Sequence, residues 1–269
     1  MLAPLLAMPD NYWVYLSLAW LIVGIWLNGK QKQPVKWPVI LTAFSLLACL
    51  VLRSYQAGYW ALTNMYESVI SLVLGLVLVW LFTLTSPGAL KLVRLAGLIL
   101  MMVLLGFSLT LPQAIEPIMP ALVSVWRAIH VPIVMLSYAL FAFSFVASVV
   151  VLIQSYRNKT SSNCTPAIHL PLDISERCIR LGFALIAIGI ILGALWANES
   201  WGVYWNWDPK ETMALATLLA YGIYLHLLYS NDKSPVLLSW VSIGAFGILL
   251  LTYFGVNVLG VGLHSYGNF

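Results

Sequence analysis

Charged residues are scarce in this sequence of 269 residues. Asp, Glu, Lys and Arg make up only 8% of it, against 62% hydrophobic residues, and the mean hydropathy is +0.94. A chain that folds in water cannot cover its surface with so few charges. This composition excludes a globular protein with a water-facing surface and predicts that lipid surrounds most of the folded chain.

Cysteine is scarce as well. The three cysteines are Cys49, Cys164 and Cys178, and none belongs to a Cys-x-x-Cys pair. Thiol exchange needs such a pair, and covalent attachment of haem needs Cys-x-x-Cys-His. The sequence therefore excludes a disulfide carrier and a c-type cytochrome. It also lacks a Gly-rich nucleotide loop, a Ser/His/Asp set and the basic stripe with interleaved aromatic residues that binds nucleic acid.

Long apolar runs recur along the chain, and each is long enough to cross a bilayer core of roughly 30 Å as a helix. We predict an all-α fold, a polytopic membrane helix bundle of about eight transmembrane helices in a single integral membrane domain, residues 1–269. The predicted helices are residues 12–28, 37–53, 68–84, 92–111, 130–153, 179–197, 212–229 and 235–254. The start, MLAPLLAMPD, has no basic region and no cleavage pattern, so we expect its apolar run to be retained.

The basic residues predict the orientation of these helices, because Lys and Arg near helix ends stay on the cytoplasmic side. Ten of the 13 follow the first, third, fifth and seventh predicted helices: Lys30, Lys32, Lys36, Lys91, Arg94, Arg157, Lys159, Arg177, Arg180 and Lys233. The remaining three are Arg53, Arg127 and Lys210. This alternation predicts that both termini lie on the outer side. The net charge of +4 is then a signal of topology.

Aromatic residues crowd the predicted connection between the sixth and seventh helices. We name this connection the tryptophan loop, about residues 198–211. Within residues 196–211 lie five aromatics: Trp196, Trp201, Tyr204, Trp205 and Trp207. Tryptophans also form interfacial belts in membrane proteins, but a belt needs no such spacing, and Gly202 allows close approach. Asp208 and Pro209 suit the N-cap and first position of the next helix, a role that can coexist with binding.

Histidine is the common axial ligand of haem iron, and the chain has four. His130 opens the fifth predicted helix at its outer end, and His264 lies in the predicted outer tail, about residues 255–269. Two imidazoles beside an aromatic surface could hold a porphyrin by its iron and its ring. Taken alone, a histidine at the membrane edge is more often an interfacial residue than a ligand, and only the combination favours ligation. We expect His169, in the long cytoplasmic connection, to be solvated.

His226 differs from the other histidines in depth. It lies 15 residues past Glu211, which places it roughly 22 Å below the outer boundary in a helix that rises 1.5 Å per residue. Ionisable groups within a membrane are costly and are functional candidates, although a neighbouring helix could instead satisfy this imidazole. A ligand near the inner leaflet and a pair outside together suggest two haem stations joined by a transmembrane route.

The run WGVYWNWDPKE, residues 201–211, closely resembles the WWD signature of the CcsA (ResC) family, which assembles cytochrome c by the System II pathway. TNMYES at 63–68 is similar to that family's outer-loop motif, and AIHVPIVMLSYALF and GLHSYG are similar to the segments that carry its two outer histidines. YGIYLHL resembles the segment with its intramembrane histidine. These matches cover most of the chain from residue 60 onward. One departure is Met213, where the family pattern has Trp.

This resemblance implies a haem-handling protein. Haem b would reach an inner site at His226, move outward, and be held by His130 and His264 over the tryptophan loop. The implied haem-binding residues of that loop are Trp201, Gly202, Tyr204, Trp205, Trp207 and Asp208. The thiols of an apocytochrome c Cys-x-x-Cys-His motif would then add to the haem vinyl groups. The resemblance further implies a ResB-type membrane partner, with which the chain would act as a cytochrome c haem lyase.

Three other interpretations remain open from the sequence. The chain could export haem without taking part in its ligation, or it could be a haem-free subunit anchored by its tryptophans. It could also belong with the WWD proteins of the System I pathway, which pass haem to a chaperone, although GLHSYG fits System II better. A bacterial inner membrane is the expected location, a thylakoid membrane is a second, and the active site is expected on the outer side.

Overall fold

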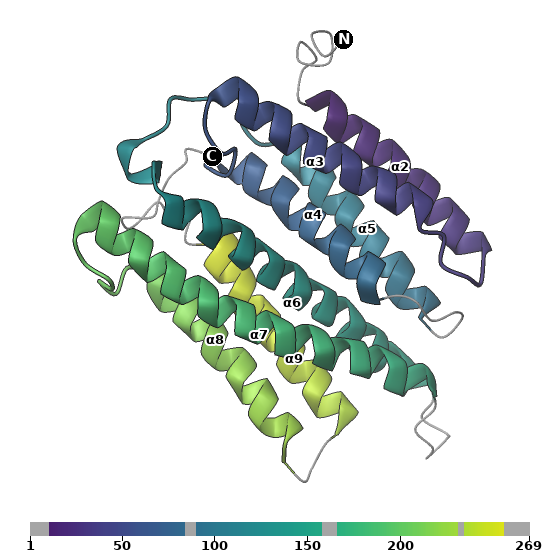
Figure 1. The fold of residues 1–269 in the computed structure, drawn as a ribbon. Helices are drawn as coiled ribbons and strands as arrows, with labels where there is room; N and C mark the ends of the chain where they lie inside the picture. The colour runs from purple at the N-terminus through teal and green to yellow at the C-terminus, as the bar shows by residue number, and fades with distance from the viewer. Residues whose placement is uncertain (1–10, 84–89, 158–165, 231–233, 256–269) are drawn as a thin grey trace. The chain divides into compact units, whose positions relative to one another are not determined.

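A computed structural model describes residues 11–83, 90–157, 166–230 and 234–255. Within these ranges the chain is helical, with no strand (Figure 1). The long helices are α2 (Asn11–Lys30), α3 (Trp37–Ala57), α4 (Met65–Thr83), α5 (Lys91–Ser108), α6 (Val125–Arg157), α7 (Pro166–Trp201), α8 (Pro209–Leu228) and α9 (Pro235–Leu250). A short 3-10 turn, η1 (Pro120–Leu122), precedes α6, and a π-turn, η2 (Leu251–Gly255), extends α9.

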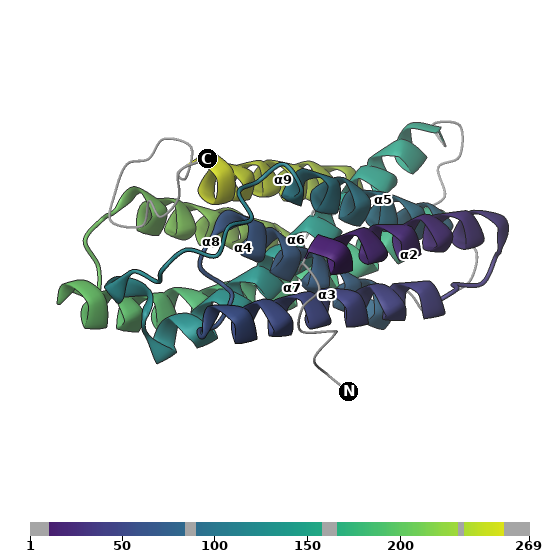
Figure 2. The same ribbon diagram turned by 90° about the horizontal axis from the view of Figure 1, so that it is seen from above.

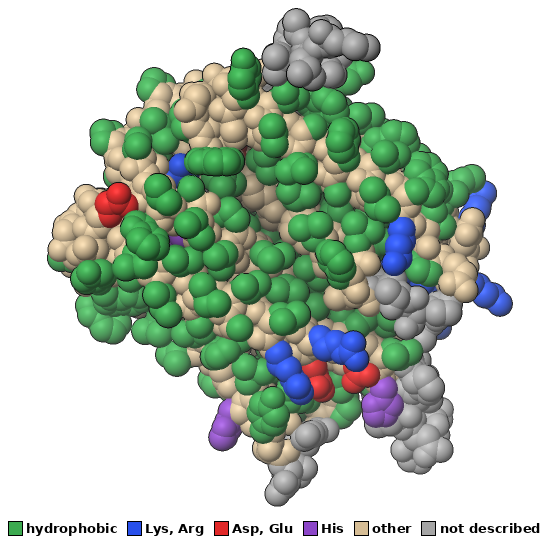
Figure 3. Space-filling model, in the orientation of Figure 1, with side chains coloured by type: hydrophobic (Ala, Val, Ile, Leu, Met, Phe, Trp, Pro, Cys, Tyr) green, Lys and Arg blue, Asp and Glu red, His purple; other side chains and the backbone are tan. Residues whose placement is uncertain are grey.

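All eight long helices are long and apolar enough to cross a membrane. The prediction of an all-helical membrane protein with about eight crossings is therefore confirmed. Hydrophobic side chains cover most of the face in Figure 3, with one mixed cluster of acidic and basic side chains low on that face and the other charged side chains toward its edges. Exposed side chains such as Ile22, Phe44 and Leu219 make sense only in contact with lipid or another apolar surface. The side of the membrane on which the termini lie stays a prediction.

Two helices extend well beyond their predicted bounds. α6 has 33 residues and α7 has 36, so each is about 50 Å long and exceeds the roughly 30 Å core of a bilayer. The sequence-based bounds stopped where charges begin. In α7 the exposed residues Asp173 and Arg177 continue the helix before residue 179, because a charged helical face is stable in water or among headgroups. The predicted bounds 130–153 and 179–197 were wrong at these ends.

The described residues form two compact units, one ending at Val123 and the other beginning at Ser124. The first contains α2 to α5, in which α2 packs on α3 and α5, and α4 packs on α3 and α5. Its core includes Trp80, whose indole N–H donates to the carbonyl of Arg94 at 3.1 Å. Most of α4 is buried, as its nearly all-apolar sequence requires.

A buried ion pair fixes one end of this first unit. Arg53 Nε lies 2.7 Å from Glu67 Oε1, and both side chains are at most 1% exposed. The other carboxylate oxygen of Glu67 accepts the Thr63 amide at 2.6 Å and the Asn64 amide at 3.4 Å, while Asn64 Oδ1 accepts the Glu67 amide. This is a capping box on α4. Arg53 also donates to the carbonyl of Gln113, so one network joins two connections of the unit.

The second unit contains α6 to α9 and is organised around the antiparallel pair of α6 and α7 (Figure 1). Three glycines of α7 bring the two helices together. A Cβ on Gly182, Gly189 or Gly193 would lie 2.7 to 2.9 Å from Phe141, Val134 or His130 respectively. Small residues at such spacing allow helix backbones in membranes to approach closely. Ser137 uses this approach and donates to the carbonyl of Gly182 at 2.8 Å.

Farther along α6, buried hydroxyls join three helices. Ser144 Oγ lies 2.9 Å from Ser175 Oγ and 3.0 Å from Ser242 Oγ, and Ser148 lies 3.0 Å from Ser175. All four are buried. With little water to compete for these groups, the hydroxyls satisfy one another and fix α6, α7 and α9 in register. The Phe141 ring stacks on Tyr221 of α8, with centroids 3.6 Å apart, so α8 is held against the same core.

Candidate functional site

The tryptophan loop and His130 lie at the same end of the second unit. Figures 1 and 2 show the α7–α8 connection beside the beginning of α6. A hydrogen bond joins the two elements, because the Ser124 hydroxyl donates to the Glu199 carboxylate. The beginning of α8 reaches the same end because α8 runs antiparallel to α7 (Figure 1). This end is the one that the distribution of basic residues predicts to be outer.

His130 packs into the surface of α7. Its Nδ1 atom lies 2.7 Å from the carbonyl oxygen of Gly189. Its ring also fills the space that a side chain at position 193 would take, since a Cβ on Gly193 would lie 2.9 Å from His130 Cε1. Two glycines spaced four residues apart thus form one face of a seat for the imidazole.

The bond to Gly189 determines the chemistry of the imidazole. A carbonyl oxygen can only accept, so Nδ1 must carry the proton, and in the neutral ring Nε2 then carries the lone pair. Histidines that bind metals typically donate their other ring N–H to a carbonyl or carboxylate, which fixes the ring and raises its basicity. His130 therefore fits an axial ligand of haem iron. Its half-buried position leaves part of the ring accessible.

Aromatic rings continue from His130 toward the loop. The His130 and Trp196 rings lie 6.0 Å apart between centroids, and the Trp196 and Trp201 rings 5.5 Å apart. Trp196 is only 6% exposed, so it supports the imidazole from within the bundle. A second pair, Trp205 and Trp207, meets edge to face at 5.8 Å. Four of the aromatic residues in this region are therefore paired in ring contacts with one another.

The loop itself begins later than predicted. α7 continues through Trp201, and Gly202 ends it in the left-handed conformation, φ +76°, with its amide donating to the carbonyl of Asn198 at 2.9 Å. This is the usual role of glycine just past a helix. The predicted start at about 198 was wrong for this reason: residues 198–201 are polar or aromatic but still helical. The non-helical connection is Gly202–Asp208.

Trp207 is a conformational outlier. Its φ is +55°, a region that costs a bulky L-residue about 1–2 kcal/mol. Strain of this kind persists only where the surroundings impose it, and it gathers at functional sites. The result is that the Trp207 side chain is 69% exposed. Tyr204, at 57% exposure, is presented by the same short connection.

Glu211 holds the strained segment in place. Its Oε2 atom accepts the amide of Asn206 at 2.8 Å and that of Asp208 at 3.2 Å. Asp208 in turn accepts the Lys210 amide at 2.9 Å and completes a capping box at the start of α8. Thr212 donates to the carbonyl of Trp207 at 3.3 Å. The expected N-cap role of Asp208 is thus observed, and it fixes the backbone on both sides of Trp207.

The structure brings together some of the predicted site residues and leaves others apart or untested. His130 lies beside the aromatic end of α7, and Trp201, Gly202, Tyr204, Trp205, Trp207 and Asp208 form the connection that follows. His264 lies outside the described residues, so its pairing with His130 stays a prediction. Sequence reasoning missed Gly189, Gly193 and Glu211 as supporting residues. Only the glycine spacing of α7 and the Asp-x-x-Glu pattern could have indicated them.

His226 lies in the last turn of α8, 17 residues past Pro209 and hence about 25 Å along the helix. Its side chain is exposed, on the opposite face from the buried Tyr224 and Leu228. No side-chain hydrogen bond joins it to another residue in the described parts of the chain. The alternative of an imidazole satisfied by a neighbouring helix of this chain therefore has no support there, and the side chain is accessible from outside the bundle.

These features define a class of protein. It is a polytopic helical membrane protein that has a packed histidine and a tryptophan-rich connection at one end. The chain belongs to the cytochrome c assembly protein family, whose model matches residues 62–264. That range includes the tryptophan loop and three of the predicted ligands, His130, His226 and His264. The resemblance inferred from the motifs is thereby confirmed.

Relatives named cytochrome c biogenesis protein CcsA match nearly the whole chain. The protein of Cyanophora paradoxa is 34% identical, with 96% of each chain covered. That of Pyropia yezoensis is 36% identical over 95% of this chain and 92% of its own. Among solved structures, the cytochrome c haem lyase CcmF superposes with a TM-score of 0.69 at 16% identity, covering 91% of this chain and 46% of CcmF. That likeness shows a shared fold.

Proposed function

We propose that this membrane protein of cytochrome c biogenesis carries haem across the membrane and presents it for attachment to apocytochrome c. The observation that carries the proposal is the His130 imidazole, whose Nδ1–H donates to the Gly189 carbonyl beside Trp196. An iron-binding histidine needs this arrangement, because the second nitrogen is oriented and made more basic. A histidine that merely anchored the helix at an interface would not need the space that Gly193 leaves for its ring.

In this proposal His130 and His264 are the axial ligands of the haem iron, and the aromatic residues of the tryptophan loop contact the porphyrin face. Trp205 and Trp207 offer rings held by a rigid connection, so haem binding would order little of the protein. Gly202, Tyr204 and Asp208 shape that connection. The haem is the substrate, protoporphyrin IX iron with unmodified vinyl groups, as in haem b.

Attachment follows from this placement. The histidine of an arriving Cys-x-x-Cys-His motif replaces one axial ligand, and each reduced thiol adds across one vinyl group. Sulfur bonds to the carbon next to the ring and hydrogen to the outer carbon, so no oxidant is consumed. The protein contributes ligation and orientation, which convert a bimolecular addition into one between positioned groups. We propose that a ResB-type membrane partner is required for this haem lyase activity.

The proposed route starts at His226, which faces outward from α8 toward lipid or a partner. With the orientation predicted from the basic residues, this station lies toward the cytoplasmic side, and His130 lies on the outer side of a bacterial inner membrane or a thylakoid. His226→Gly should then lower the haem content of the purified protein without disturbing the helix bundle, because its side chain is exposed.

A visible absorption spectrum of the protein, purified from haem-replete cells with and without the partner, tests the proposal. We expect six-coordinate low-spin haem that is lost in the His130→Ala, His264→Ala double variant. Haem transport with a spectrum unchanged by that double variant would instead favour an exporter without ligation. A colourless protein would contradict both.

A further inference from the structure

We propose that Arg180 binds a haem propionate at the His226 station, an inference that rests on the proposed function and adds a second ligand group to that site. A haem molecule offers iron, a flat apolar ring and two carboxylates. A station on an exposed helix surface needs a partner for each, since a carboxylate left in an apolar environment without one is costly. His226 supplies only the iron ligand.

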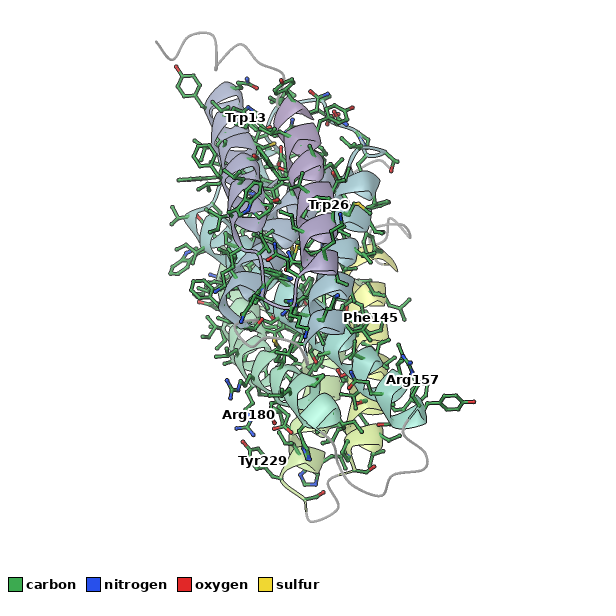
Figure 4. The ribbon with its side chains drawn as sticks, turned by 90° about the vertical axis from the view of Figure 1, so that its right-hand side faces the viewer. Trp13, Trp26, Phe145, Arg157, Arg180 and Tyr229 are labelled. Atoms are coloured by element: carbon green, nitrogen blue, oxygen red, sulfur yellow. The ribbon has the colours of Figure 1, made fainter. Side chains whose placement is uncertain are left out.

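A cation lies near the end of α8, where it contacts Tyr229 and not His226 itself. Tyr229 follows His226 by three residues on α8, so the two side chains are neighbours on one face. The guanidinium carbon of Arg180, on α7, lies 5.6 Å from the centroid of the Tyr229 ring. Figure 4 shows the labelled side chains of Arg180 and Tyr229 close together near the end of α8. Tyr229 therefore connects the arginine to the histidine across the two helices.

His226 lies on the exposed face of α8, one turn after a residue that contacts α7. The buried face of α8 is formed by Thr217, Tyr221, Tyr224 and Leu228. Gly222, four residues before His226, lies against Phe183 of α7, with its Cβ position 3.7 Å from the ring. Gly222 and Tyr229 thus flank His226 along the α7 side of the helix. An iron bound to His226 would place one edge of a porphyrin over the α7–α8 border.

Arg180 has the capacity to bind a further carboxylate. Its one described ion pair, to Glu176 in the preceding turn, is 3.5 Å long, and the arginine side chain is 50% exposed. Such exposed pairs contribute little. The guanidinium carries five N–H donors and can bind a carboxylate with two of them at once. Most of its donor capacity is therefore available to a ligand at this surface.

The remaining surface suits the porphyrin ring. Leu219 and Ile223, which precede His226 on the exposed face of α8, are 60% and 57% exposed. They lie farther from the end of the helix than His226, whereas Tyr229 and Arg180 lie toward it. Toward the C-terminal end of α8, the surface is first apolar, then carries the imidazole of His226, and then the guanidinium of Arg180. A haem would bind with its propionates directed toward Arg180, near the end of α8.

The test separates the propionate contact from the station itself. Haem binding is measured by titrating ferric protoporphyrin IX and its dimethyl ester, which lacks both carboxylates, into the full-length protein in detergent. All variants carry His130→Ala and His264→Ala, so that binding reports on the His226 station. Arg180→Gln should weaken binding of the free acid about tenfold, the loss expected for one charge-assisted hydrogen-bonded contact. Binding of the ester should not change.

Two variants serve as controls. Arg180→Lys should recover part of the affinity, because it keeps the charge but loses the two-pronged geometry. Arg177→Gln, an exposed arginine on the same helix, should leave both affinities unchanged. His226→Gly should abolish the ligand spectrum of both porphyrins.

The outcomes are distinct. If His226→Gly removes binding but Arg180→Gln does not separate the acid from the ester, the propionate contact is overturned and the station stands. Equal loss of both porphyrins in Arg180→Gln also overturns it, since the arginine would then support the fold. If His226→Gly binds both porphyrins as before, the proposed inner station is itself wrong.

Discussion

The Nδ1 atom of His130 lies 2.7 Å from the carbonyl oxygen of Gly189 on the neighbouring helix. This hydrogen bond leaves Nε2 as the basic nitrogen, and the absence of a side chain at Gly193 gives the ring its place. The ligand chemistry of this histidine is thus set by two glycines, which have no side-chain functional groups. The surroundings of the His130 ring can therefore be altered by substitutions that leave all the proposed haem ligands in place.

Gly193→Ala should disturb haem ligation while leaving His130 in the chain. The new Cβ would lie 2.9 Å from His130 Cε1 and 3.1 Å from Nδ1, so the ring must move away from Gly189. We expect about tenfold weaker iron binding at the outer station, the usual loss when a supporting hydrogen bond to a metal ligand is disturbed. Haem titration followed by the Soret band measures it. Gly247→Ala, with nothing within 4 Å, is the matched control, and a normal affinity in Gly193→Ala would contradict the prediction.

Gly182→Ala should destabilise the second unit. Its Cβ would lie 2.7 Å from Phe141, and Phe141 cannot retreat because it stacks on Tyr221 with centroids 3.6 Å apart. Overpacking of this kind costs about 1–3 kcal/mol. Thermal unfolding in detergent should show the loss. Gly244→Ala, which meets nothing within 4 Å, should be neutral or gain up to about 1 kcal/mol in helix propensity. Equal behaviour of the two variants would show that the helices separate without cost.

Glu67→Ala should be among the most damaging single changes in the first unit. It leaves Arg53 buried without its carboxylate and removes the acceptor of the Thr63 amide, at a cost of about 3–5 kcal/mol. The double variant Arg53→Met, Glu67→Leu removes both charges, so we expect it to recover part of that loss. The comparison requires unfolding curves for all three proteins. A double variant less stable than Glu67→Ala would show that the pair contributes more than charge compensation.

Trp207→Ala and Trp207→Gly should separate binding from strain. Both remove an indole that is 69% exposed, so both should retain less haem. Only glycine adopts φ +55° freely, and Trp207→Gly should therefore be about 1 kcal/mol more stable than Trp207→Ala. Haem content and thermal unfolding are measured side by side. Unchanged haem content in both variants would remove Trp207 from the mechanism, and equal stability would show that the loop relaxes.

Much of the fold could be predicted because hydropathy is a local property. Each of the eight apolar segments can be recognised within about twenty residues of sequence, and the structure has a helix at every predicted position. The ends of α6 and α7 could not be placed in this way. Their terminal turns are charged or aromatic, and whether such turns stay helical depends on the packing of the flanking helices and on caps such as Gly202.

The candidate site, too, could be predicted from the sequence only in part. The tryptophans, Asp208 and the histidines were identifiable because their residue types and spacing carry the chemistry. The support they receive was not, since Gly189 acts through its backbone carbonyl and Gly193 through the side chain it lacks. The pairing of Tyr229 with Arg180 joins residues 49 positions apart in the sequence, and no local pattern predicts such a contact.

The sequence by itself determined that this chain is an integral membrane protein, that it has eight segments long and apolar enough to cross a membrane, and that tryptophans crowd the connection before α8. Those properties depend on the transfer of individual residues between water and hydrocarbon, which each residue brings with it. Only the tertiary structure decided which nitrogen of His130 is basic, why Trp207 points outward and which cation contacts Tyr229. These depend on the approach of one helix to another, which is fixed by shape and close packing and not by any single residue.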